Sequence, residues 1–212
     1  MEYKNKRMEI SDGEYEHEFG AYMADVDVMG GFYGSYSFKN SENVVYKDGD
    51  FDHTTGMHSN YSIFKNGTFG DYTGFESENT IVIGGSYGSN TLEGAENVKV
   101  YIENAQSVYK PESGYLIAGK DVGEIYTEDR LEKLCVYTTK DNVRGDYNEK
   151  TTRTLLPSEL EEILDEVNFN HFKDIEDYET LSLAMEQLIC RVDEVSLPYV
   201  NLDIWLYFLF FL

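Results

Sequence analysis

The sequence has few of the residues that mark several common protein classes. Its 212 residues include 2 cysteines, 3 prolines and 1 tryptophan. Cys135 and Cys190 stand far apart, which excludes a disulfide framework and the paired spacing of a zinc site. Basic residues are scarce as well, because 17 Lys and Arg face 40 Asp and Glu, a formal net charge of −23. Such a chain repels nucleic acid and anionic membranes and attracts basic partners.

Long apolar segments are also lacking, apart from one run at the C-terminal end. Residues 1–20 contain no apolar core, so we expect no signal peptide there. Residues 204–212 are strongly apolar, but this run is much shorter than the ~20 residues that a membrane-spanning helix needs. We therefore expect no membrane span and a cytoplasmic location. The apolar run is interpreted as a buried segment, an oligomer contact or part of a longer segment.

What the sequence does contain is an 18-residue repeat, which is clearest in SENTIVIGGSYGSNTLEG at residues 77–94. Three columns carry the pattern when the chain is written in blocks of 18. The glycine column consists of Gly13, Gly31, Gly49, Gly67 and Gly85. The ring column consists of Tyr15, Tyr33, Phe51, Phe69 and Tyr87. The third column consists of Ile10, Val28, Tyr46, Phe64, Val82 and Val100.

These columns predict a mainly β fold, a parallel β-solenoid in which each block forms one coil. A recurrent glycine suits a corner that needs positive φ or close backbone approach. β-branched and aromatic columns suit strands whose side chains stack on their equivalents in the coils above and below. We predict that residues 1–148 form the solenoid, with clear repeats at 5–102 and degenerate coils at 103–148.

The C-terminal half of the chain departs from the repeat. Leu116, Ala118, Leu134 and Val136 still fall in register, but a short helix capped by Thr127 is an alternative for residues 127–136. Residues 149–212 are predicted to be a helical cap or interaction segment, with a loop at 168–173. The first apolar series at helical spacing is Leu160, Ile163, Leu164 and Val167, after Pro157. The second, in a helix beginning near Asp174, is Tyr178, Leu181, Met185, Leu188 and Val192.

We expect this helical segment to fold over the last coil, because an open solenoid end exposes unpaired backbone and apolar side chains. A second role as a contact between identical chains is compatible with that position.

Eighteen residues also divide into three sixes. The apolar file at this spacing consists of Val45, Phe51, Met57, Ile63, Phe69, Phe75, Ile81 and Tyr87. The file resembles the left-handed hexapeptide β-helix family, a three-sided prism, although the register breaks at Asp27, Lys39 and Glu93. The resemblance implies an alternative function: an acyltransferase working as a trimer, with His53 or His58 as general base between subunits. The handedness of the solenoid stays open.

Metal and cofactor sites are not indicated by the sequence. Residues 85–94, GSYGSNTLEG, resemble the glycine-rich nonapeptide of calcium β-rolls, but Asn90 stands where a carboxylate ligand is needed. His17 and His53 share a column, yet two coils separate them by about 10 Å, too far to share a metal ion. We therefore predict no metal, no cofactor and no catalytic residues.

Carboxylates recur at fixed positions of the coil. Glu42, Glu78 and Glu96 share one column, and Asp48, Asp50 and Asp52 crowd another corner. We predict that these acidic residues bind a basic protein partner, and that the chain is a non-enzymatic binding or structural module. A narrower version of this function is mimicry of nucleic acid, which would occupy a DNA-binding protein. Another alternative is glycan binding, with Tyr36, Tyr72 and Tyr126 as exposed candidates for stacking on sugars.

Overall fold

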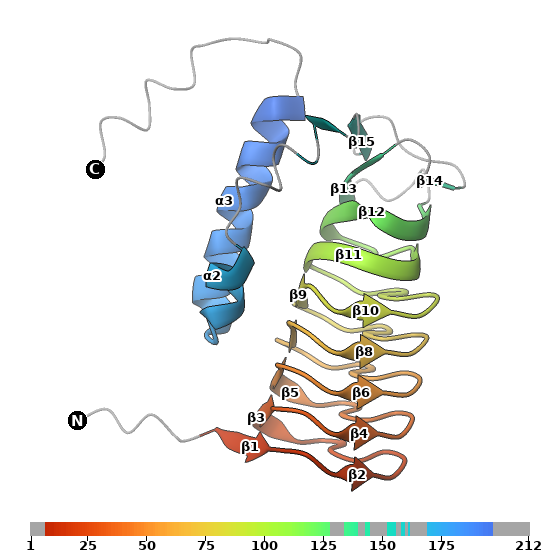
Figure 1. Cartoon of the computed structure of the whole chain (residues 1–212), viewed down its shortest axis with the longest axis vertical. Helices are drawn as coiled ribbons and strands as arrows, with labels where there is room; N and C mark the ends of the chain where they lie inside the picture. The colour runs from red at the N-terminus through yellow and green to blue at the C-terminus, as the bar shows by residue number, and fades with distance from the viewer. Residues whose placement is uncertain are drawn as a thin grey trace, which may run out of the picture.

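The computed structural model describes residues 7–127, 134–139, 143–144, 152–155, 158–159, 161 and 169–196. Its strands are β1 (Met8–Ile10), β2 (Glu14–Tyr15), β3 (Ala24–Val28), β4 (Phe32–Tyr33), β5 (Glu42–Tyr46), β6 (Asp50–Phe51), β7 (Ile63–Phe64), β8 (Thr68–Phe69), β9 (Ile81–Ile83), β10 (Ser86–Tyr87), β11 (Val98–Tyr109), β12 (Gly114–Tyr126), β13 (Leu134–Thr139), β14 (Val143–Arg144) and β15 (Thr152–Leu155). The helices are α2 (Phe169–Asp174) and α3 (Tyr178–Ser196). The coils stack into one elongated solenoid, with both helices beside it (Figure 1).

The strands form two parallel ladders along the solenoid. β1, β3, β5, β7 and β9 make the first ladder, and β2, β4, β6, β8 and β10 make the second. β11 is long enough to pass round the corner and pair with both. Paired residues are one 18-residue coil apart, as Ile63 with Ile81 and Asp50 with Thr68 show. The predicted parallel β-solenoid with 18-residue coils is confirmed.

The glycine column lies at the corner between the two ladders. Gly67 has a φ of +118°, and a Cβ at this residue would lie 2.6 Å from the carbonyl oxygen of Gly49. A side chain would therefore collide with the coil beneath and would also strain the backbone. This close approach of successive corners explains the recurrent glycine.

The ring column points into the solenoid and forms a continuous stack. The rings of Phe51 and Phe69 have centroids 4.7 Å apart and lie within 5° of parallel. Phe69 and Tyr87 follow with centroids 5.0 Å apart. The third column faces this stack from the first ladder, and Phe64 meets Phe69 edge-on at 5.3 Å. The core of the coil is thus two facing files of side chains, as the columns predicted.

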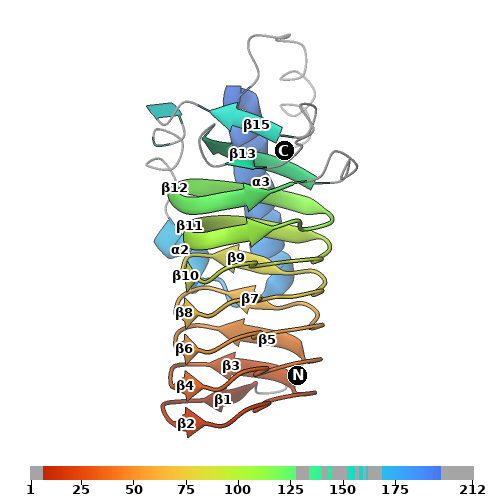
Figure 2. The same ribbon diagram turned by 90° about the vertical axis from the view of Figure 1, so that its right-hand side faces the viewer.

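The third side of each coil is closed by a hydrogen-bonded turn segment rather than a β-strand. These segments are residues 17–22, 35–40, 53–58, 71–76 and 89–94, and Figure 2 shows them crossing between the ladders one above another. In the second of them, Tyr36, Phe38 and Asn40 all have φ between 53° and 61°. The amides of Tyr36 and Asn40 donate to the next coil, whereas the amide of Phe38 donates to Phe19 in the preceding one. Alternating conformations thus let the backbone bond in both directions.

The later coils keep the interior but lose the 18-residue period. β11 pairs with β12 at separations of 16 and then 17 residues, with a register shift between Ile102 and Asn104. Ala105 nevertheless continues the ring column, because it pairs with Tyr87. The in-register residues of the degenerate coils, Leu116, Ala118, Leu134 and Val136, are all buried. Residues 128–133 lie outside the described residues, and β13 starts at Leu134 as a strand.

The two helices lie along the outer face of the first ladder (Figures 1 and 2). The stripe predicted for the longer helix is confirmed for Leu181, Met185 and Leu188, which pack on the ladder. Residues 169–174 form α2, so the predicted loop at 168–173 is wrong there. The first predicted helix falls largely on residues outside those described. The helical segment was predicted to fold over the last coil, but α2 and α3 cover the side of the solenoid instead of its end.

The outward face of the first ladder explains this position. Val45, Ile63 and Ile81 point away from the interior, and α2 and α3 bury them in a second apolar cluster. Side chains alternate along a strand, so their neighbours Val44 and Tyr46 point inward. The six-residue file is therefore not a single inward file. Its members lie in the interior, under the helices and on the third side, which differs from the arrangement that the hexapeptide resemblance implies.

Candidate interaction surfaces

The predicted glutamate column forms a file along one edge of the solenoid. Glu42, Asn60, Glu78 and Glu96 pair in that order as successive parallel bridges. All three glutamates are exposed, and the amide of the exposed Glu112 on the next coil donates to the carbonyl of Ala95. The coil spacing is about 4.8 Å. We call Glu42, Asn60, Glu78, Glu96 and Glu112 the glutamate file; Glu112 was missed because the later coils are shorter than 18 residues.

An amide file lies next to the glutamate file and fixes its backbone. Asn79 Nδ2 donates to Asn60 Oδ1 at 2.8 Å, and Asn97 Nδ2 donates to Asn79 Oδ1 at 2.5 Å. Asn43 donates to Asp25 at 2.6 Å in the same column. Asn43, Asn79 and Asn97 have φ values between 50° and 54°. Asparagine tolerates that conformation, so this column lets the backbone turn at the corner beside the glutamates.

The three aspartates lie away from the glutamate file. Asp48 is at the corner between the ladders, where its carboxylate accepts from the amide of Gly49 at 2.9 Å. Asp50 is exposed on the outer face of β6. Asp52 follows β6 and accepts from Ser35 Oγ at 2.7 Å. The structure therefore divides the six predicted residues into two groups, the glutamates on one edge and the aspartates around the second ladder.

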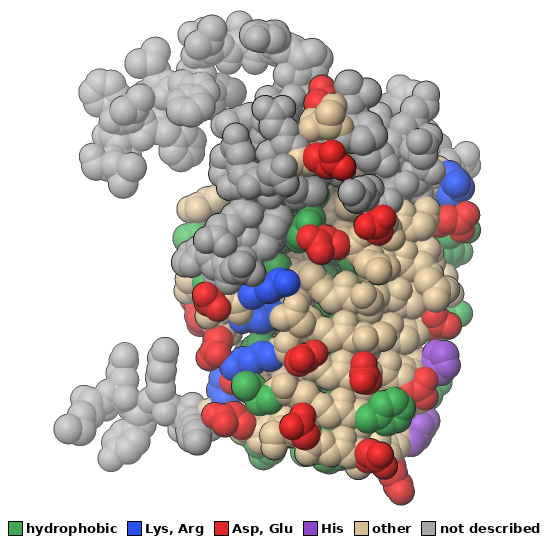
Figure 3. All heavy atoms as spheres, viewed as in Figure 1, with side chains coloured by type: hydrophobic (Ala, Val, Ile, Leu, Met, Phe, Trp, Pro, Cys, Tyr) green, Lys and Arg blue, Asp and Glu red, His purple; other side chains and the backbone are tan. Residues whose placement is uncertain are grey.

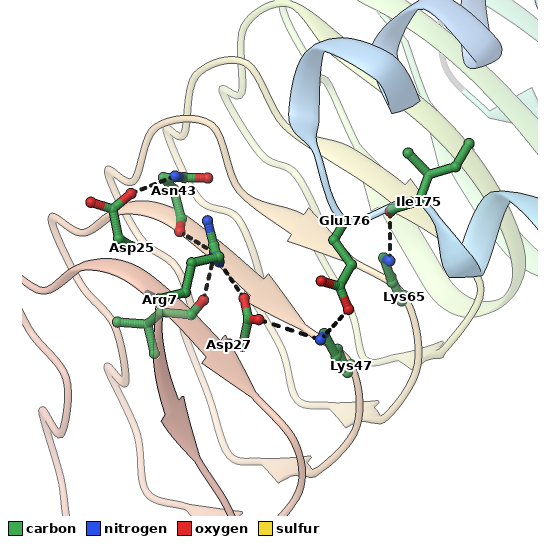
Figure 4. A network of polar contacts seen from close by, with 9 residues as sticks. Arg7, Asp25, Asp27, Asn43, Lys47, Lys65, Ile175 and Glu176 are labelled. Atoms are coloured by element: carbon green, nitrogen blue, oxygen red, sulfur yellow. Dashed lines mark hydrogen bonds and ion pairs between the residues drawn. The ribbon is translucent and has the colours of Figure 1, made fainter. Parts of the chain in front are cut away.

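Several cations lie on the helix-bearing side of the solenoid (Figure 3), whereas Lys39, Lys110 and Arg144 lie elsewhere. Arg7 pairs with Asp27, and Lys47 Nζ lies 3.3 Å from the same carboxylate and 2.5 Å from Glu176 (Figure 4). Lys99 Nζ binds Glu186 at 2.6 Å and also donates to Ser182. The pairs of Lys47 with Glu176 and Lys99 with Glu186 join the solenoid to α3 and to the segment before it.

Lys65 is the most buried of these cations. Its Nζ donates to the carbonyl oxygens of Lys173 and Ile175, each at 2.6 Å, at the C-terminal end of α2 (Figure 4). A cation at this end of a helix satisfies carbonyls that lack helical partners. Burial lowers the pKa of Lys65 from its ordinary value. Burial acts in the same direction on Lys47, but its bonds with Glu176 and Asp27 outweigh it and raise the Lys47 pKa.

The candidate general bases lie on the third side of the solenoid. His53 Nε2 is 3.6 Å from Asp52, and His53 Nδ1 is 3.8 Å from Asp71 on the next coil. His58 Nδ1 is 3.3 Å from Glu76. In the part of the chain that the structure describes, no group of three His, Cys, Asp or Glu is placed to hold a metal ion.

Comparison with known proteins gives no assignment: no protein-family model, no characterised protein and no solved structure matches this chain. None of the helices among the described residues is both long enough and apolar enough to cross a membrane. The apolar residues 204–212, and with them the predicted oligomer contact, lie outside the described residues. The fold and the side-chain geometry are therefore what supports a function.

Proposed function

We propose that this chain is a non-enzymatic binding module that presents a rigid acidic surface to a basic protein partner. The observation that carries the proposal is the unequal placement of charge. Arg7, Lys47, Lys65 and Lys99 bond to groups of this chain on the helix-bearing side. The glutamates of the glutamate file are exposed at the starting edge of the same ladder, where Glu42 begins β5, and no ion pair among the described residues involves Glu42, Glu78 or Glu96. The exposed edge thus keeps its negative charge for a partner.

The glutamate file suits such a partner because it is regular and preorganised. Its carboxylates sit on backbone that is hydrogen-bonded to the coils above and below. The backbone of this row is already ordered before binding, so only the glutamate side chains lose conformational freedom when a partner binds. Charges arranged this way act mainly on the association rate and on the choice of partner.

Nucleic-acid mimicry is the narrower version of this function. Duplex DNA carries about one charge per 1.7 Å of its axis. The glutamate file offers at most one carboxylate per coil, about one per 4.8 Å, and Asn60 interrupts it. A partner that uses the file therefore meets a sparser charge than a duplex presents. Competition by duplex DNA distinguishes a mimic from a module with its own basic partner.

The test uses two triple variants with the same change in charge. One replaces Glu42, Glu78 and Glu96 with Lys, and the other replaces Asp48, Asp50 and Asp52 with Lys. Partners are captured from a cell lysate with each purified protein at about 50 and 200 mM salt, where surface electrostatics differ strongly. We expect the glutamate variant to lose the salt-sensitive partners that the wild type and the aspartate variant retain, with all three proteins equally folded by circular dichroism.

Three results would contradict the proposal. Recovery of the same partners by the wild type and both variants would remove the charge-driven function. Equal loss in both variants would show a response to net charge rather than to the glutamate file. Turnover of an acyl donor that depends on His53 or His58 would instead support the trimeric transferase.

A further inference from the structure

Two exposed tyrosines occupy the same position of the third side, two coils apart. Tyr36 and Tyr72 are 37% and 39% exposed. The amide of Tyr36 donates to the carbonyl of His53, and the amide of Tyr72 donates to that of Ser89, each at 2.9 Å. Between them lies Thr54, which is buried and small. The backbone at both tyrosines is thus fixed by hydrogen bonds, and only the small side chain of Thr54 lies between the two rings.

The backbone conformation at these tyrosines favours a smaller residue. Tyr36 has a φ of 61° and Tyr72 a φ of 60°. Bulky side chains are strained there, whereas asparagine tolerates the conformation and occupies it at Asn90 in the same column. Tyr61 also has a positive φ, but its ring packs edge-on against Tyr178 at 5.1 Å. Tyr36 meets His17 edge-on at 5.1 Å and has Lys39 Nζ 5.9 Å from its ring centroid, and Tyr72 meets Phe75 edge-on at 6.2 Å. These contacts leave more than a third of each tyrosine exposed.

A row of polar side chains runs beside these tyrosines at the preceding position of each coil. Ser35 Oγ donates to Asp52 at 2.7 Å, and His53 lies between Asp52 and Asp71. The amide of Ser89 donates to Asp71 at 2.6 Å. The third side therefore combines aromatic faces with aligned carboxylate, imidazole and hydroxyl groups.

The two rows fit an extended sugar chain lying along the solenoid axis. The two tyrosines are separated by two coils, about 10 Å. In an extended β-1,4-linked glycan, alternate sugars turn the same face to one side, and the disaccharide repeat is close to that separation. An aromatic face packs on the apolar face of a sugar, and a few placed polar groups fix its orientation.

We propose that the third side of the solenoid binds a neutral β-1,4-linked glycan. Tyr36 and Tyr72 stack on alternate sugars, and Asp52, His53 and Asp71 hydrogen-bond to the hydroxyl groups between them. The two carboxylates repel sugars that carry carboxylate or sulfate groups, which limits the ligand to uncharged chains. This site is separate from the glutamate file and does not depend on the proposed protein partner.

The test is calorimetric titration of the full chain with cellohexaose and with chitohexaose, two neutral β-1,4-linked hexasaccharides. Maltohexaose, whose α-1,4 linkages make the chain coil, is the ligand control. Tyr36→Asn and Tyr72→Asn remove one ring each and keep a residue that suits the left-handed backbone. Tyr36→Phe and Tyr72→Phe keep the ring. Tyr22→Asn is the matched protein control, because Tyr22 is 77% exposed with a φ of 64° but lies outside the column.

We expect at least one β-1,4-linked hexasaccharide to bind and maltohexaose to bind much more weakly. Each Tyr→Asn change should weaken binding about tenfold, while the Tyr→Phe variants and Tyr22→Asn bind as the wild type does. The proposal is overturned if neither β-1,4-linked ligand binds, if maltohexaose binds equally well, or if Tyr22→Asn weakens binding as much as Tyr36→Asn and Tyr72→Asn do.

Discussion

Replacing Phe69 with alanine removes the middle ring of the interior stack. Phe69 is 2% exposed and lies between Phe51 and Tyr87, whose ring centroids are 4.7 and 5.0 Å away. Truncating a buried ring costs about 3–5 kcal/mol of unfolding free energy. Stacked and edge-on ring pairs each add about 0.5–1.5 kcal/mol beyond area burial. Because Phe69 loses both stacked neighbours and the edge contact with Phe64, we expect the upper half of that range.

Urea unfolding followed by circular dichroism measures this loss. With a denaturant dependence of about 2 kcal/mol per molar urea, the midpoint should fall by roughly 2 M. Phe32→Ala is the matched control, because Phe32 lies on the same ladder but is 53% exposed on its outer face. That change should move the unfolding free energy by less than about 0.5 kcal/mol. Equal midpoints for the two variants would refute the inward stack.

Two further predictions concern the join between the solenoid and the helices. Lys65→Met should lower the unfolding free energy by about 1–3 kcal/mol and speed hydrogen exchange in α2, because it leaves two carbonyls without their donor; Lys39→Met, on the third side, should do neither. Burial, with smaller contributions from Tyr61 and Glu186, raises the pKa of Tyr178 to about 12 from an ordinary value of 10. Its neutral phenol therefore stabilises the fold below pH 10, and that contribution is lost as the pH rises from 10 to 12. Tyr178→Phe should flatten the alkaline fall in stability measured by thermal unfolding, and an unchanged slope would contradict the assigned environment.

The interior could be predicted from the sequence because each coil repeats the same contacts. A glycine corner such as Gly67 and a ring such as Phe69 recur every 18 residues, and stacking on an identical neighbour favours the same residue type in each coil. The third side could not be predicted in this way. Its left-handed residues include Tyr36, Phe38 and Thr54, and the glycines that recur at Gly20, Gly56 and Gly74 give way to Phe38 and Leu92 in the same column. Asn40 and Asn90, which also have positive φ on this side, are the signal that was available.

The sequence also indicates where the helices pack, although the 18-residue repeat makes this indication hard to recognise. The outward column of the first ladder begins with Glu9 and Asp27, continues with Val45, Ile63 and Ile81, and returns to charge at Lys99. An apolar run in an outward column needs a cover, and α3 extends this cover past Lys99 to Tyr101, Ile117 and Tyr137. The two carbonyls that accept from Lys65 belong to residues 108 and 110 positions further along the chain. The 18-residue repeat therefore holds no information on them.

The contacts between the solenoid and the helices also affect which charged residues are exposed on the surface. The helical segment lies over the apolar run, and Lys47, Lys65 and Lys99 bond to its carboxylates and carbonyls. These bonds neutralise or bury cations that would otherwise attract the chain's own exposed acids. The glutamate file, on an edge without such cations among its paired residues, keeps its charge. The distribution of exposed acidic residues therefore depends on how the chain folds on itself as well as on its composition.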